Sequence, residues 1–73
     1  MAERLRVVKL KPDELFRVVC VSNRGAEDTG LDVGVEYTVR RVRECYATGE
    51  RGYELDTLRG YWYDHRAFSR IPR

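Results

Sequence analysis

The chain has 73 residues and a formal net charge of +2, with 36% charged and 42% hydrophobic residues. This length is near the lower limit for a domain stabilised by one hydrophobic core, and this composition excludes a disordered chain. No apolar run approaches the roughly 20 residues of a membrane-spanning helix, and no signal peptide begins the chain. We therefore expect one small cytoplasmic domain that does not bind membranes.

The two cysteines, Cys20 and Cys45, are far apart in the sequence and form no CxxC pair. In a reducing compartment both are expected to be reduced thiols, with Cys20 in the core. Metal binding would require them to converge with His65, and their spacing matches no zinc pattern. We therefore predict no metal site and no cofactor.

Residues 1–15 form a basic extension ahead of the predicted domain, which covers residues 16–73. Apolar residues at positions 5, 7, 8 and 10 interleave with basic ones, a pattern that suits a short strand with one change of phase. Pro12 then stops any helix or central strand. The extension is predicted to be either an edge strand packed on the domain or a basic tail, and the strand is favoured.

Residues 16–39 contain two predicted strands joined by a long loop. The first strand, residues 16–22, has apolar side chains on both faces, so both faces are expected to be covered. The acidic loop at residues 23–34 contains turn-forming residues, and Leu31 and Val33 are predicted to anchor it in the core. Apolar and polar residues then alternate from Val33 to position 39, as in a strand.

This alternation slips by one residue at Arg40-Arg41, which predicts a β-bulge or a sharp bend. The strand resumes to about residue 46, and shorter strands are predicted at residues 53–57, 61–63 and 69–71. Asp64 is expected to cap one 3₁₀ turn over Asp64-Phe68. Five or six short strands with tight turns and one long early loop predict an all-β fold, a small and partly open barrel.

Several short motifs follow one another in a familiar order. They are Cys20-Val21-Ser22-Asn23, Gly25-Ala26-Glu27, Leu31-x-Val33-Gly34-x-x-Tyr37-x-Val39, Gly60-Tyr61-Trp62-Tyr63 and Arg66-Ala67-Phe68. This set resembles small SH3-like barrel proteins of bacteriophages and bacterial prophage regions, over roughly residues 16–71. The resemblance implies an SH3-like barrel encoded by a phage or prophage. It implies no site, since most members of that family are uncharacterised, and the chain departs from the pattern at Ser22, where an Asp is usual.

Catalysis is not expected. His65 lies beside Asp64 and four residues before Ser69, which is the nearest approach to a catalytic set. A triad needs a nucleophile within hydrogen-bond reach of the base and a pre-organised oxyanion site, and the chain has no nucleophile elbow. We predict that His65 is a surface residue and that the protein is not an enzyme.

A nucleic-acid surface is one candidate for binding. The aromatic residues Tyr61, Trp62 and Tyr63 would stack on bases while guanidiniums hold phosphates. The guanidiniums are those of Arg40, Arg41, Arg43 and Arg59. Strand alternation, however, predicts that either Trp62 alone or Tyr61 and Tyr63 together are buried.

A protein-binding surface is the favoured candidate. Glu27, Asp28 and Asp32 of the acidic loop would face whichever aromatic residue is exposed and bind a basic or extended peptide. A solvated turn is the simpler explanation of these acids. An edge strand that pairs with a partner or a second copy is a further option, giving a monomer or a weak homodimer. The sequence therefore favours a non-catalytic adaptor for a protein or peptide, with a nucleic-acid-binding barrel and a structural module as alternatives.

Overall fold

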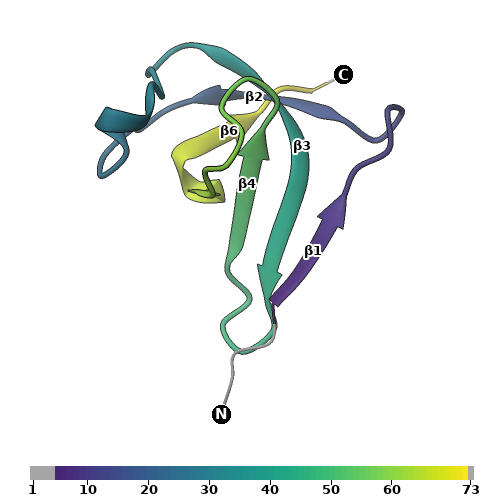
Figure 1. The fold of residues 1–73 in the computed structure, drawn as a ribbon. Helices are drawn as coiled ribbons and strands as arrows, with labels where there is room; N and C mark the ends of the chain where they lie inside the picture. The colour runs from purple at the N-terminus through teal and green to yellow at the C-terminus, as the bar shows by residue number, and fades with distance from the viewer. Residues whose placement is uncertain (1–4, 73) are drawn as a thin grey trace.

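The computed structural model describes residues 5–72, which form six β-strands and two 3₁₀ turns without an α-helix (Figure 1). In chain order these are β1 (Leu5–Lys9), β2 (Phe16–Cys20), η1 (Glu27–Thr29), β3 (Glu36–Cys45), β4 (Arg51–Leu55), β5 (Tyr63–Asp64), η2 (His65–Ala67) and β6 (Phe68–Arg70). The prediction of an all-β small barrel with a 3₁₀ turn near Asp64-Phe68 is confirmed. Residues 1–4 of the predicted extension and residue 73 lie outside the described residues.

The strands form one antiparallel sheet that curls into a half-barrel, in the order β5-β4-β3-β2-β6. The long strand β3 is shared, because residues 36–39 pair with β2 and residues 41–45 pair with β1. Figure 1 shows β1 beside the lower half of β3, and β2 crossing its upper end. Residues 5–9 of the basic extension are thus an edge strand of the same sheet.

The register of the sheet shifts within β3. Val39 pairs with Leu55, but Arg41, two residues further on, pairs with Glu54, so one residue of β3 has no partner in β4. After the shift Val42 packs against the core, while Arg41 and Glu54 lie on the opposite face. The bulge predicted at Arg40-Arg41 is confirmed.

The hydrophobic core lies on the concave inner face of the half-barrel. Its buried residues are Val18, Cys20, Leu31, Tyr37, Val39, Leu55, Tyr63 and Phe68. Phe16 and Tyr53 extend the core, with their rings edge to face and the ring centroids 5.4 Å apart. Both cysteines are buried reduced thiols, and Cys20 lies in the core as predicted.

The acidic loop between β2 and β3 is anchored at one of its two predicted positions. Leu31 is 1% exposed, whereas Val33 is 56% exposed. Gly34 has a φ of 87°, in the left-handed region, and it lies in a turn over residues 32–35. Strand β3 therefore begins only at Glu36, and the prediction of Val33 as a core anchor is wrong because that residue belongs to the turn.

Candidate functional site

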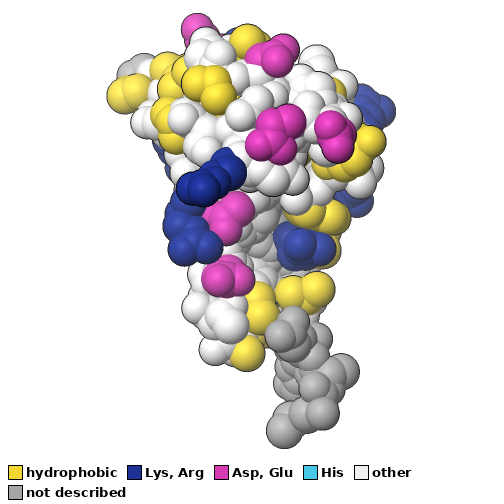
Figure 2. Space-filling view, turned by 90° about the vertical axis from the view of Figure 1, so that its left-hand side faces the viewer, with side chains coloured by type: hydrophobic (Ala, Val, Ile, Leu, Met, Phe, Trp, Pro, Cys, Tyr) yellow, Lys and Arg dark blue, Asp and Glu magenta, His cyan; other side chains and the backbone are white. Residues whose placement is uncertain are grey.

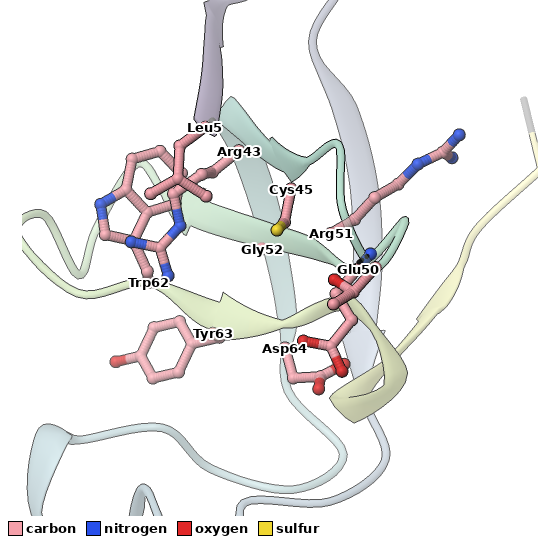
Figure 3. A pocket seen from close by; sticks show the side chains of 10 residues that line it. Leu5, Arg43, Cys45, Glu50, Arg51, Gly52, Trp62, Tyr63 and Asp64 are labelled. Atoms are coloured by element: carbon pink, nitrogen blue, oxygen red, sulfur yellow. Dashed lines mark hydrogen bonds between the residues drawn. The ribbon is translucent and has the colours of Figure 1, made fainter. Parts of the chain in front are cut away.

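The three consecutive aromatic residues occupy three different environments. Tyr63, the first residue of β5, is buried in the core, Trp62 is half-buried, and Tyr61 is 47% exposed. Trp62 and Tyr63 point to opposite sides of the backbone (Figure 3). Neither arrangement predicted from strand alternation is correct, because Tyr61 precedes the strand and the alternation begins only at Tyr63.

Tyr63 connects the acidic loop to the aromatic residues. Its hydroxyl donates a hydrogen bond of 2.7 Å to Oγ1 of Thr29, the last residue of η1. The Thr29 hydroxyl in turn donates a hydrogen bond of 2.8 Å to the carbonyl of Ala26. Tyr61 lies beside Tyr63, with the two ring centroids 6.2 Å apart. The core therefore holds η1 and the exposed Tyr61 in fixed positions relative to each other.

We name the exposed residues Glu27, Asp28 and Tyr61 the loop face. Neither carboxylate forms an ion pair with another of the described residues. Figure 2 looks onto the side of the molecule where η1 lies and shows acidic side chains mainly over the upper half, with hydrophobic groups between them. Asp32, the third predicted acid, lies in the following turn, and within residues 5–72 no interaction joins its carboxylate to residues 61–63.

Three of the four arginines that were predicted to hold phosphates bind carboxylates of the chain. Arg41 donates two hydrogen bonds to Glu54, one of them 2.6 Å from Nε to Oε1. Arg40 lies 3.6 Å from the same carboxylate, and Arg59 lies 3.2 Å from Asp56. Arg40 and Arg41 share the one carboxylate of Glu54, so the three positive charges are partly compensated within the protein.

Glu54 is the important charged residue that the sequence did not single out. It is 1% exposed, and besides Arg41 it accepts a hydrogen bond of 3.2 Å from the backbone N–H of Gly60. The hydrogen bonds from Arg41 lower the pKa of Glu54 below its ordinary value, although burial acts to raise it. The only indication in the sequence was the bulge, which brings Arg41 opposite Glu54. Within β4 alone, Glu54 lies between apolar residues, a pattern that predicts an exposed glutamate.

A pocket of about 490 Å³ opens on the outer face of the sheet, opposite the core (Figure 3). One part of it is lined by Leu5 of β1, Arg43 and Cys45 of β3, Gly52 of β4, and Trp62. The structure thus brings together two predicted binding residues, Arg43 and Trp62, in a pocket that Tyr63 also lines. The sequence did not predict this pocket, because four strands that are distant in the chain form its walls.

The other end of the pocket is lined by Glu50, Arg51 and Asp64, and Arg66 forms ion pairs with both carboxylates. Asp64 accepts a hydrogen bond of 2.8 Å from the backbone N–H of Arg66 and so caps η2 as predicted. The side-chain hydrogen bonds of Arg66, together with this backbone bond, lower the pKa of Asp64 to about 2. At neutral pH the pocket therefore has compensated acids at one end and the Arg43 guanidinium at the other.

His65, the histidine considered for catalysis, packs against an aromatic ring. The ring of His65 packs edge-on against Tyr53, with the centroids 6.3 Å apart. Among residues 5–72, no three side chains of His, Cys, Asp or Glu lie close enough together to hold a metal ion. The features of the described chain that remain for function are the loop face and the outer pocket.

Comparisons with protein-family models, curated proteins and solved structures found no match to the chain. In the part of the chain that the structure describes, no helix has the length and apolar character of a membrane span. A function for this protein therefore has to be argued from its own side chains.

Proposed function

We propose that the protein is a non-catalytic adaptor that binds a protein or peptide through the loop face. The observation that supports this is the hydrogen bond from Tyr63 to Thr29, which fixes η1 beside the exposed ring of Tyr61. A rigid aromatic group gives contact area at a small entropic cost, and charges at its rim orient the partner. The resemblance to small phage barrels is in keeping with an adaptor encoded by a phage or prophage.

The charge of the loop face favours a basic partner. Glu27 and Asp28 lie in the first turn of η1, and both are exposed. Since neither carboxylate is compensated by a described basic residue, a Lys- or Arg-rich segment would gain attraction without displacing an internal ion pair. Tyr61 would then contact the aliphatic part of such a side chain or a neighbouring apolar residue.

A capture experiment with matched variants tests this function. The wild-type chain and the double variant Glu27→Gln/Asp28→Asn would be immobilised and exposed to a lysate of the organism that carries the gene. We expect the wild type to retain a basic protein, and the variant to bind the purified partner about five- to ten-fold more weakly. The control Glu36→Gln/Glu44→Gln removes the same charge from exposed pairs with Arg17 and Arg51. Equal binding by wild type and loop variant, or no retained protein, would contradict the proposal.

Nucleic-acid binding is the second candidate, because Arg43 lies over the Trp62 ring. Its support is weaker, since Arg40, Arg41 and Arg59 are paired with acids of the chain. We expect no binding of a labelled single strand at about 50 mM salt, where phosphate contacts are strongest. Measurable anisotropy change at this salt, with steep loss of affinity by about 200 mM, would support the nucleic-acid candidate instead.

Pairing of β1 with a second copy is less favoured. Leu5 and Val7 are each 50% exposed on this edge strand. However, β1 also carries Arg6 and Lys9, so an antiparallel pair of two β1 strands would bring four positive charges into one short ladder. Basic residues on an edge strand oppose self-pairing, which agrees better with a monomer.

A further inference from the structure

The outer pocket is hollow because Gly52 has no side chain. Trp62 stands over this glycine, since a Cβ atom built on Gly52 would lie 3.7 Å from Cε3 of the indole and 3.8 Å from Nε of Arg43. These are ordinary contact distances, and Gly52 has no positive φ, so an alanine would fit there and reduce the depth of the pocket. The glycine therefore leaves open space beneath one aromatic ring and one guanidinium.

Arg43 supplies a charge that no carboxylate of the described chain compensates. The ion pairs of residues 5–72 do not involve Arg43; the arginines that form them are Arg17, Arg40, Arg41, Arg51, Arg59 and Arg66. Its guanidinium is instead held by the Trp62 ring, 5.0 Å from the ring centroid, with Arg41 5.5 Å from the same centroid. A guanidinium in this position is oriented in advance to bind a planar anion through two parallel hydrogen bonds.

Apolar surface lies beside this guanidinium. Leu5 is 50% exposed, and in Figure 3 its side chain points toward Trp62 and Arg43. Cys45 adds a buried wall from β3. An anion that binds Arg43 would therefore place any apolar group attached to it between Leu5 and the indole, where it is removed from water.

Among the described residues, Arg43 is the one lining cation without an ion pair, so the pocket suits a ligand with a single negative charge. At the far end Arg51 pairs with Glu44, and Arg66 pairs with the lining acids Glu50 and Asp64, so no unpaired cation is available there for a second anionic group. A nucleic-acid strand, which carries a phosphate at every nucleotide, is disfavoured for this reason. The guanidiniums over Trp62 also compete with a base for the faces of the ring.

We propose that the outer pocket binds the C-terminal residue of a partner polypeptide, with its carboxylate on Arg43 and an apolar side chain between Leu5 and Trp62. A C-terminal residue carries one carboxylate and one side chain on the same Cα atom, which matches a pocket where the guanidinium and the apolar wall are adjacent. None of the three loop-face residues lines this pocket, so the site does not depend on the loop face being a binding surface.

The only tryptophan of the chain lies in this site, so its fluorescence and its indole N–H resonance report binding directly. The probe is the peptide acetyl-Gly-Ser-Leu with a free carboxylate, and its C-terminal amide is the matched control. We expect a saturable change at Trp62 with the acid at concentrations up to about 10 mM, the range suited to weak, fragment-sized ligands. The amide is expected to bind at least about ten-fold more weakly, because it lacks the charge-assisted hydrogen bonds to Arg43.

Variants separate the parts of the site. Arg43→Gln is expected to weaken binding of the acid about ten-fold or more, and Arg43→Lys to restore only part of it, because an ammonium cannot form the bidentate pair. Gly52→Ala should weaken binding by filling the pocket floor. The control Arg17→Gln removes an exposed arginine of β2 and should leave binding unchanged, as should the loop variant Glu27→Gln/Asp28→Asn.

Three results would overturn the proposal. The first is no saturable change at Trp62, or equal affinity for the acid and the amide, in the wild-type chain. The second is binding of acetyl-Gly-Glu-Leu-amide as tight as that of the free acid, which would assign the pocket to acidic side chains rather than to a C-terminus. The third is an Arg43-dependent response of Trp62 to a single-stranded oligonucleotide that the peptide acid does not produce, which would assign it to nucleic acid.

Discussion

Replacing Leu31 by alanine is expected to lower the free energy of unfolding by about 3 kcal/mol, the usual size for a large-to-small change in a well-packed core. Leu31 is 1% exposed and is the one fully buried side chain between β2 and β3. A domain of this length has a total stability of roughly 4–11 kcal/mol. The substitution therefore removes a large share of the stability and releases the loop that carries Glu27 and Asp28.

The matched control for this prediction lies two residues away. Val33→Ala removes methyl groups from a side chain that is 56% exposed in the turn, so we expect a change within about 0.5 kcal/mol. Urea unfolding followed by the fluorescence of Trp62 gives both values, provided that the slope of the transition stays constant. Equal destabilisation by the two variants would mean that the loop is not anchored by Leu31.

The strands and the bulge were predictable because they depend on local patterns. Alternation of side chains identifies a strand wherever one face is buried, and the one-residue slip at Arg40-Arg41 is the direct sequence trace of an extra residue in β3. Asp64 is similarly local, since its carboxylate caps a backbone N–H only two residues further on. In each case the physical cause lies within a few residues of the sequence.

Predictions failed where side-chain alternation continues past the end of a strand. Val33 continues the alternation of β3, but the left-handed φ of Gly34 places it in a turn. Tyr61 and Tyr63 have the spacing of one strand face, yet only Tyr63 reaches the core because β5 begins there. Alternation shows which residues would share a face of a strand, but where the strand begins is decided by its neighbours in the sheet.

The sequence identified candidate binding residues but did not show which of them lie together. Trp62 and Arg43 are brought together by the pairing of β3, β4 and β5, and the end of η1 is joined to β5 by the hydrogen bond between Tyr63 and Thr29. These contacts join residues that are 19 and 34 positions apart. One sequence does not show which distant residues pair. Aromatic and charged residues that were predicted to form one surface are therefore found in two separate places in the structure.

Glu54→Gln is expected to destabilise the fold by about 2 kcal/mol at neutral pH. Breaking a buried ion pair costs more than the pair contributes, because the remaining charges lose their partner. Glu54 is 1% exposed and forms ion pairs with both Arg40 and Arg41. The side chain of Arg41 is 36% exposed and keeps some hydration, so the loss should fall below the roughly 3–5 kcal/mol of a fully buried pair. The glutamine oxygen can still accept the hydrogen bond from Gly60, but its NH2 group replaces one oxygen that accepts from Arg41, so the variant loses a hydrogen bond together with the charge.

The lowered pKa of Glu54 determines how its contribution to stability changes with pH. The pKa of Glu54 is lower in the folded protein than its ordinary value, so its charge stabilises the fold above that ordinary value. This stabilisation is lost as the pH falls from the ordinary pKa through the folded one, because the unfolded chain then binds a proton first. Unfolding midpoints measured from neutral pH into this acidic range should therefore converge for wild type and Glu54→Gln.

The exposed pair of Glu44 with Arg51 supplies the control, since Glu44→Gln should change stability by no more than about 0.5 kcal/mol. A constant difference between wild type and Glu54→Gln at all pH values would show that lost packing, not lost charge, causes the destabilisation.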